Sequence, residues 1–214
     1  MLLTSRKTKQ KILAEFLPIC VFEGWSDQAL IMAMSNCGID RKFLPLIFEN
    51  GVVDLARFYI EEQNHKTAEI VGDLSEKKIR DKIHLLLYAR FEVEEKNKIV
   101  LQRLKTFRLH GLKAFYEIAD FMWKNIGDPS TDFNFYTKRL TLAKIIFRSL
   151  RFFLKHDLAE TKNFIDLEIE RVMKFERHKK QVKNFFGEVF LNETGQIKSP
   201  KEIIKNLPFF RLVK

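Results

Sequence analysis

The residues that interrupt helices are scarce in this sequence. Its 214 residues include 8 glycines and 5 prolines, which are few for a β-rich chain punctuated by turns. There is also no run of about 18 apolar residues, the minimum for a membrane-crossing helix. Because 46% of the residues are hydrophobic and 31% are charged, the composition is that of a globular chain. We therefore predict an all-α protein without a transmembrane helix.

Cysteine is scarce too, and the motifs of common enzyme classes are missing. The two cysteines, Cys20 and Cys37, form no C-x-x-C pair, so we expect reduced structural thiols rather than a zinc or redox site. The sequence has no glycine-rich phosphate loop and no nucleophile elbow. We therefore predict no catalytic residues, no metal and no cofactor.

Two short motifs offer an alternative, a di-iron enzyme. Glu62 and His65 form a Glu-x-x-His motif, and Asp81 and His84 form an Asp-x-x-His motif. Two such motifs with two further carboxylates can hold two iron ions in a four-helix bundle. The second motif has the shorter carboxylate, and the apolar helices predicted over residues 112–154 contain no lone inward glutamate. Solvated helix faces explain these side chains better.

Positive charge is concentrated at the two ends of the chain, whose net charge is +10. From Arg171 onward there are eleven lysines and arginines against four glutamates, so this region holds seven of the ten net charges. Four more come from Arg6, Lys7, Lys9 and Lys11, and the middle is close to neutral. Basic ends favour an anionic partner, either phospholipid or nucleic acid.

The first 50 residues have the pattern of a helix-turn-helix unit. Three short helices, predicted over residues 6–21, 29–36 and 40–48, precede a longer one over 52–71. This order resembles the N-terminal domain of TetR-type transcriptional regulators. A recognition helix must present polar side chains to base edges, whereas the third segment reads RKFLPLIFEN and is largely apolar. A ligand-responsive DNA-binding regulator is therefore the alternative function, and we expect no specific nucleic acid as partner.

The stretch Gly127–Ile146, GDPSTDFNFYTKRLTLAKII, is the most distinctive in the chain. Glycine and proline interrupt the helical pattern, and polar side chains then offer N-cap acceptors, so we predict a helix that begins near Asp132. Its first turn carries Phe135, Tyr136 and a further phenylalanine, which cannot all be buried in one stripe at 100° per residue. We expect part of this aromatic surface, with Arg139, to face a partner.

Other boundaries follow from local signals. Leu74, Ser75 and Ile79 form a hydrophobic staple, which predicts a helix capped by Ser75. Asn97 and Gly111 predict breaks before the next two helices. The helix that begins near residue 132 continues to about residue 154, is apolar on nearly every side, and is expected to end at Asp157. Such a helix is either buried all round or lines a cavity, and a well-packed core is the more common outcome.

The C-terminal region predicts an amphipathic helix. Bulky apolar residues recur at helical spacing on one face, opposite a face rich in lysine. A helix of this kind is suited to a membrane interface, where each lysine near an anionic leaflet adds about 1 kcal/mol. The alternative is that the apolar stripe packs on the body as the last core helix. The membrane-binding candidates are Val182, Lys183, Phe185, Phe186, Val189 and Phe190.

Two runs together carry a family resemblance, FEGWSDQAL at Phe22–Leu30 and STDFNFYTKR at Ser130–Arg139. With these runs the chain resembles, over roughly residues 12–174, the coenzyme Q biosynthesis protein 9 family, accessory lipid-binding proteins of ubiquinone synthesis. One position departs from the family pattern: Phe135 stands where the family usually has tryptophan. The apolar ring is kept, but the indole N–H is lost.

The resemblance implies a TetR-like fold, a lipid pocket and a C-terminal helix that binds bilayers. It also implies that the segment near residue 132 docks the demethoxyubiquinone hydroxylase, a di-iron enzyme. The matching positions are Asp132, Phe135, Tyr136 and Arg139. The pocket would bind an isoprenoid quinone intermediate or a phospholipid. Its candidate lining residues are Phe115, Ile118, Met122, Leu142, Ile146, Leu150 and Phe153.

These observations combine into one predicted organisation of about ten helices. Residues 1–50 form a helix-turn-helix-like head, 51–178 a helical lipid-binding domain, and 179–214 an amphipathic membrane-binding tail. We predict a non-enzymatic accessory protein that presents lipid to the hydroxylase, and a homodimer by analogy with TetR-like folds. No signal or transit peptide is evident. We therefore expect a bacterial cytoplasmic protein, peripheral on the inner membrane, or a matrix-side mitochondrial one if a presequence was removed.

Overall fold

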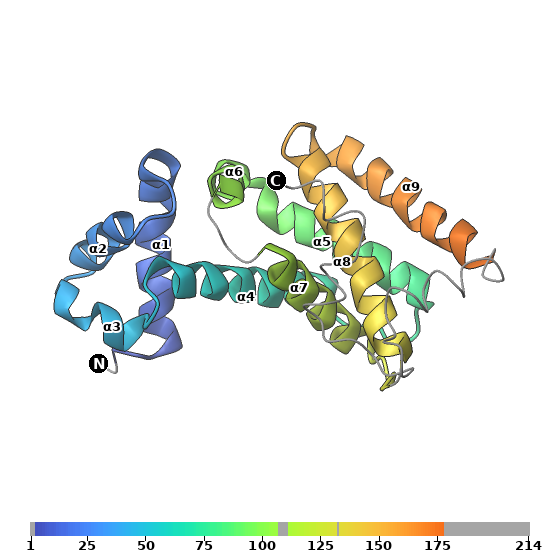
Figure 1. Ribbon diagram of the computed structural model, residues 1–214, viewed down its shortest axis with the longest axis horizontal. Helices are drawn as coiled ribbons and strands as arrows, with labels where there is room; N and C mark the ends of the chain where they lie inside the picture. Colours follow the sequence, from blue (N-terminus) through green and yellow to red (C-terminus); the bar gives the residue numbers. More distant parts are fainter. Residues whose placement is uncertain (1–2, 107–110, 132, 178–214) are drawn as a thin grey trace, which may run out of the picture.

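The computed structural model describes residues 3–106, 111–131 and 133–177, and across these residues every regular element is helical (Figure 1). The prediction of an all-α protein is confirmed, and the helix order is consistent with a TetR-like fold. The described part contains nine α-helices and one short 3₁₀ helix, η1. Their bounds are α1 Arg6–Glu23, α2 Asp27–Asn36, η1 Arg41–Phe43, α3 Leu44–Ile47, α4 Val52–Val71, α5 Ile79–Glu95, α6 Lys98–Thr106, α7 Gly111–Ile126, α8 Phe133–Phe153 and α9 Leu158–Arg177.

The first three helices form a small head at one end of the molecule, coloured blue in Figure 1. Local caps define its helices. The Ser5 hydroxyl accepts the N–H of Thr8 at 3.2 Å, and the Ser26 hydroxyl accepts the N–H of Ala29 at 3.2 Å. Each bond satisfies a helix N–H that has no partner within its helix. Ser5 therefore caps α1, and Ser26 caps α2.

Trp25 anchors the head to the rest of the chain. Its ring lies 4.9 Å from that of Phe16 in α1 and 5.7 Å from that of Tyr59 in α4. Its indole N–H donates to the carbonyl oxygen of Val100 in α6 at 3.2 Å. One buried side chain therefore joins three helices, and the hydrogen bond satisfies an indole donor that would be costly to bury alone.

Gly51 sets the angle between the head and α4, which runs from the head into the body (Figure 1). Its φ is +57°, a region that favours glycine. A Cβ at this position would lie 2.3 Å from Oδ1 of Asp27. That same oxygen accepts the N–H of Val52 at 2.8 Å. A residue of α2 therefore caps α4, and only glycine leaves room for it.

The third segment of the head contains little that could read DNA. It consists of η1 and the four-residue α3, whose sequence LPLI is wholly apolar. Leu46 exposes 60% of its surface, and a leucine offers no hydrogen bond to a base edge. The alternative of a DNA-binding regulator gains no support from this geometry.

Two predicted helix signals differ from the structure, and others are confirmed. α5 begins at Ile79, so the predicted cap at Ser75 is wrong. Asp73 instead accepts both the N–H and the hydroxyl of Ser75, each at 2.9 Å, in a local turn. Asp157, expected to end α8, caps α9 through the N–H of Glu160 at 2.7 Å. The predicted breaks near residues 97 and 111 and the start of a helix near residue 132 are confirmed.

The helices of the body pack in antiparallel neighbours, α4 with α5, α7 with α8, and α8 with α9. Their shared core is apolar and continuous with that of the head. Within the residues described, no helix combines the length and hydropathy needed to cross a membrane.

Candidate functional site

The hairpin of α7 and α8 contains the stretch singled out from the sequence, and a glycine turn forms its end. Gly127 has φ +79° and its N–H donates to the carbonyl oxygen of Lys124 at 3.0 Å. The N–H of Asp128 then reaches back to the carbonyl oxygen of Trp123 at 3.1 Å. These bonds satisfy the last carbonyl groups of α7. The chain then turns towards α8 with the Asp128 side chain facing inward, 2% exposed.

Arg139 lies at the centre of the hairpin and is 1% exposed. Its Nε donates to Oδ1 of Asp120 in α7 at 2.6 Å. Its Nη1 donates to the carbonyl oxygen of Phe135 at 3.0 Å and lies 3.3 Å from Oδ2 of Asp128 in the turn. A buried charge is tolerated when it is paired and hydrogen-bonded. Arg139 therefore ties together α7, the turn and the first turn of α8.

A second cation, Lys138, completes this ion-pair network. Its Nζ lies 2.6 Å from Oδ1 of Asp128 and donates to the hydroxyl of Ser130 at 2.6 Å. The Ser130 hydroxyl donates to the same Asp128 oxygen at 2.8 Å. The Nζ also lies 5.2 Å from the centre of the Trp123 ring, within cation–π range. Each oxygen of Asp128 therefore has a cationic partner.

The network keeps both aspartates ionised. Burial alone would raise their pKa values. For Asp120 the hydrogen bonds and charges of Arg139 and Lys124 outweigh burial, and its pKa is lowered. For Asp128 the bonds from Lys138, Ser130 and Arg139 do the same, and its pKa is also lowered. The network therefore surrounds two ionised carboxylates with three cations, Arg139, Lys138 and Lys124.

The aromatic pair of the site, Phe135 and Tyr136, rests on this network. The guanidinium carbon of Arg139 lies 3.4 Å from the centre of the Phe135 ring, and the Phe135 and Tyr136 rings meet edge to face at 5.1 Å and 75°. Both rings are half-buried. They therefore form part of the surface at the start of α8, as expected. Asp132 lies outside the described residues.

Arg139 differs from the sequence expectation. It was expected to face a partner with the aromatic residues, and instead it is buried beneath them. The reason is that two carboxylates converge on its position, one from α7 and one from the turn. Sequence reasoning missed Asp120 altogether. The sequence offers no clear signal for this pairing, because α8 also contains Lys138, Lys144, Arg148 and Arg151.

The seven candidate lipid-binding residues come together on α7 and α8. Five are buried, and Phe115 and Leu150 are half-buried against the same core. The Phe115 ring packs edge to face on that of Phe147 at 5.3 Å. The buried members are Ile118, Met122, Leu142, Ile146 and Phe153. This cluster on α7 and α8 is part of the continuous core, and its Phe153 ring also meets the Phe91 ring of α5 at 5.2 Å.

Two other sets of predicted residues have different outcomes. The membrane-binding candidates, Val182, Lys183, Phe185, Phe186, Val189 and Phe190, lie outside the described residues. The di-iron candidates are held apart by other partners: Glu62 pairs with Arg6 of α1 at 2.7 Å, and His84 pairs with Asp166 of α9 at 2.8 Å. Among the described residues, no group of three or more metal-ligating side chains could hold a metal ion.

Fold and site together define an all-α protein of TetR-like helix order, with a charged hairpin that presents two aromatic rings. The comparison with known proteins then adds a family similarity. Residues 109–176, which include this hairpin, match the family model described as COQ9. The resemblance inferred from the sequence is confirmed.

Two curated relatives agree with this similarity. The ubiquinone biosynthesis protein COQ9, mitochondrial, of Bos taurus is 22% identical over 204 residues, covering 85% of this chain and 62% of the bovine protein. The protein of the same name from Rattus norvegicus is 35% identical over 77 residues, covering 35% of this chain and 25% of the rat protein. The chain thus spans less than two thirds of the length of either relative.

Proposed function

We propose that this chain is a non-enzymatic, lipid-binding accessory protein of ubiquinone biosynthesis. It binds an isoprenoid quinone intermediate or a phospholipid and presents it to the demethoxyubiquinone hydroxylase. The observation that carries the proposal is the hairpin of α7 and α8. It lies within the residues that match the COQ9 family model, and a buried ion-pair network supports its two half-exposed aromatic rings.

The aromatic pair is the proposed docking surface for the hydroxylase. Phe135 and Tyr136 are rigid rings with two side-chain torsions each, so holding them in an interface costs little conformational entropy. Arg139 stacks under Phe135 at 3.4 Å and bonds its carbonyl oxygen. It therefore acts as a positioning residue, and the surface is ordered before the partner arrives. Such preorganisation lowers the entropic cost of binding.

The cluster between α7 and α8 is the proposed lipid site. Its half-buried members, Phe115 and Leu150, form the outer edge, and its buried members continue into the core. A lipid tail that enters at this edge would replace contacts between apolar side chains with contacts between those side chains and the lipid, which are chemically similar. The docking surface is at the start of α8 in the same hairpin, so a bound lipid and the docked enzyme would share one element.

The proposed location is a membrane surface. Both relatives are named as mitochondrial proteins. For this chain we propose peripheral binding to a bacterial inner membrane or to the matrix side of the mitochondrial inner membrane, through the amphipathic segment 179–214. In liposome flotation, the full chain is expected to float with anionic vesicles, and a chain truncated before Lys179 is expected to stay at the bottom. Equal flotation of both would remove the tail from the proposal.

A pull-down with purified hydroxylase tests the docking surface. Tyr136→Lys places a charge in the aromatic pair and is expected to abolish binding while the circular dichroism spectrum and thermal midpoint stay unchanged. Asn134→Lys is the matched control, because it adds the same charge two residues away at an exposed position and should still bind. Retained binding by Tyr136→Lys would refute the surface.

Native mass spectrometry of the purified chain tests the lipid site. We expect copurified quinone intermediates or phospholipids, and we expect Leu150→Asp, which places a charge at the edge of the cluster, to lose them. Leu167→Asp is the control, since Leu167 is exposed on α9. A lipid-free wild-type protein would count against lipid presentation.

A further inference from the structure

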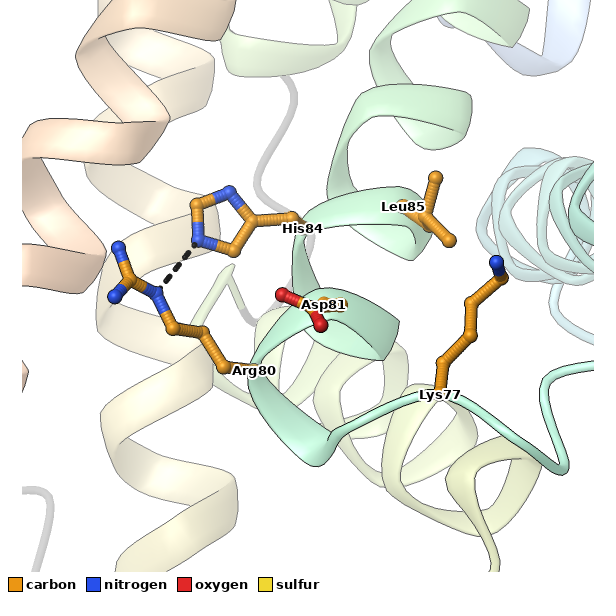
Figure 2. A pocket seen from close by; sticks show the side chains of 5 residues that line it. All are labelled: Lys77, Arg80, Asp81, His84 and Leu85. Atoms are coloured by element: carbon orange, nitrogen blue, oxygen red, sulfur yellow. Dashed lines mark hydrogen bonds between the residues drawn. The ribbon is translucent and has the colours of Figure 1, made fainter.

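An open pocket of about 510 Å³ lies at the start of α5, and five side chains line it, none of them from the hairpin (Figure 2). Lys77, Arg80, Asp81, His84 and Leu85 supply two fixed positive charges, one negative charge and an imidazole. None of the residues proposed above for docking or lipid binding belongs to this lining. The pocket therefore requires its own explanation, which is independent of the proposed function.

The imidazole of His84 is held in a defined orientation by α9. Its Nδ1 lies 2.8 Å from Oδ1 of Asp166. The Tyr88 hydroxyl donates to the same carboxylate oxygen, and the Tyr88 ring meets the His84 ring edge to face at 5.8 Å and 85°. An ionised carboxylate can only accept hydrogen bonds, so the His84 Nδ1 carries a proton. The other ring nitrogen, Nε2, is thereby assigned the role of an acceptor when the ring is neutral.

Arg80 faces this second nitrogen. Its Nε lies 3.5 Å from Nε2 of His84, the contact drawn dashed in Figure 2. At 3.5 Å this is a long and weak hydrogen bond. A protonated imidazole would turn Nε2 into a second donor, and the two N–H groups would then repel unless an anion accepted from both. The Asp166 carboxylate, already bonded through Nδ1, compensates the imidazolium charge.

We propose that Arg80 and His84 form a binding site for a compact oxyanion, a phosphate or phosphate monoester. One ligand oxygen accepts hydrogen bonds from Arg80 Nε and from protonated His84 Nε2, and Lys77 adds a point charge across the pocket. The proton comes from solvent, and no covalent bond changes. Arginine and imidazolium N–H donors form the strongest class of hydrogen bonds to such oxygens. The ligand is either a free metabolite or the head group of a lipid.

The charges around the site predict whether each substitution strengthens or weakens anion binding. Asp81 lies between the Arg80–His84 pair and Lys77 (Figure 2) and opposes an anion. Asp166 acts through His84 and does not line the pocket. Binding should therefore strengthen when Asp81 loses its charge and weaken when Arg80 or His84 is replaced.

The test is a titration of the full chain with sodium sulfate, followed by NMR of the histidine ring nitrogens. The His84 signals are expected to shift and saturate as sulfate is added. Arg80→Gln and His84→Gln should each weaken binding about tenfold or more, the loss of one charge-assisted hydrogen bond. Asp81→Asn should tighten it. Lys96→Gln, which removes an exposed charge at the far end of α5, should change nothing.

Each outcome decides the proposal. Tightening by Asp81→Asn cannot result from misfolding, so it supports the site even if another variant is unstable. Equal sulfate affinity for wild type, Arg80→Gln and His84→Gln, or no saturable shift, would overturn it.

Two further probes identify the source of the oxyanion. If the site binds a free metabolite, glycerol 3-phosphate should compete with sulfate, and Arg80→Gln should bind vesicles as wild type does. If the site takes a lipid head group, Arg80→Gln should lose affinity for phosphatidylcholine vesicles containing phosphatidic acid and bind pure phosphatidylcholine vesicles as wild type does.

Discussion

Two buried arginines, each in a different helix pair, show how the same residue type produces opposite local chemistry. Arg139, in the hairpin of α7 and α8, pairs with two aspartates. Arg90, in the pair of α4 and α5, is 5% exposed and pairs with one carboxylate, Glu94, at 3.0 Å. Arg90 also donates to the side-chain oxygen of Asn64 at 2.6 Å.

The carboxylates respond in opposite directions. Burial raises the pKa of Glu94. Arg90 and the other groups around Glu94 lower this pKa, but by less, so it is raised overall. Burial also acts on Asp120 and Asp128, but there the hydrogen bonds and charges of nearby cations prevail, and both pKa values are lowered. Lys124 and Lys138 hydrogen-bond the two aspartates, whereas Lys66 acts on Glu94 only through its charge and does not outweigh burial. A buried arginine keeps its carboxylates ionised when further cations share them, and a single deeply buried partner shifts towards its neutral form.

The largest expected effect comes from removing each arginine. Arg139→Met leaves two aspartates without their shared cation and should lower the free energy of unfolding by about 3–5 kcal/mol. Arg90→Met leaves one glutamate whose raised pKa favours neutralisation, so its cost should be smaller. Urea denaturation followed by circular dichroism measures both. A greater loss for Arg90→Met would contradict the comparison.

Neutralising one carboxylate in each network should have a smaller effect. Asp128→Asn removes a charge that Lys138 and Arg139 both use, and should cost about 1.5–3 kcal/mol of unfolding free energy. Glu94→Gln should cost about 1 kcal/mol or less, because the amide can still accept from Arg90 and can donate to the Tyr59 hydroxyl. Urea titrations at neutral pH measure the loss of unfolding free energy for both variants. Equal losses would show that the two carboxylates do not differ in this way.

Lowering the pH should separate the two regions without mutation. Asp120 and Asp128 have lowered pKa values, so their stabilisation is complete above the unfolded-state pKa and is lost as the pH falls through the folded-state value. Glu94 has a raised pKa, so its ionisation is unfavourable at high pH, and protonation relieves this as the pH falls. Amide hydrogen exchange, corrected for intrinsic rates, should show α8 losing protection relative to α5 as the pH falls from about 5 to below about 3. Equal losses of protection in α5 and α8 would contradict this prediction.

The smallest expected difference concerns the two tryptophans. Trp25→Phe removes a hydrogen bond to the Val100 carbonyl oxygen, whereas the buried indole N–H of Trp123 has no hydrogen-bond partner among the described residues. Both variants lose a similar amount of packing. Trp25→Phe should therefore lower the free energy of unfolding by about 1 kcal/mol more than Trp123→Phe does. Thermal unfolding of the two single variants provides the measurement, and a larger loss for Trp123→Phe would show that its contact with Lys138 matters more than the Trp25 hydrogen bond.

The prediction of the candidate site from sequence was partial. The start of α8 and the half-buried position of Phe135 and Tyr136 follow from capping residues and from the angle between successive side chains. The burial of Arg139 does not follow from these rules. Its partner Asp120 is 19 residues away on another helix, and the pairing depends on how α7 is rotated against α8. The Ser75 cap failed for a different, local reason, since the Asp73 carboxylate accepts both the N–H and the hydroxyl of Ser75.

By itself the sequence determined the helical class, most helix boundaries and the concentration of aromatic residues at the start of α8. These properties depend on contacts within a few residues along the chain, such as caps, turns and the 3.6-residue period. Only the tertiary structure decided that Arg139 is a buried support, that Glu94 and Asp128 shift in opposite directions, and that Arg80 and His84 share a pocket whose imidazole α9 orients. Those outcomes depend on which side chains adjacent helices bring within a few ångströms of each other, because burial and ion pairing act over that distance.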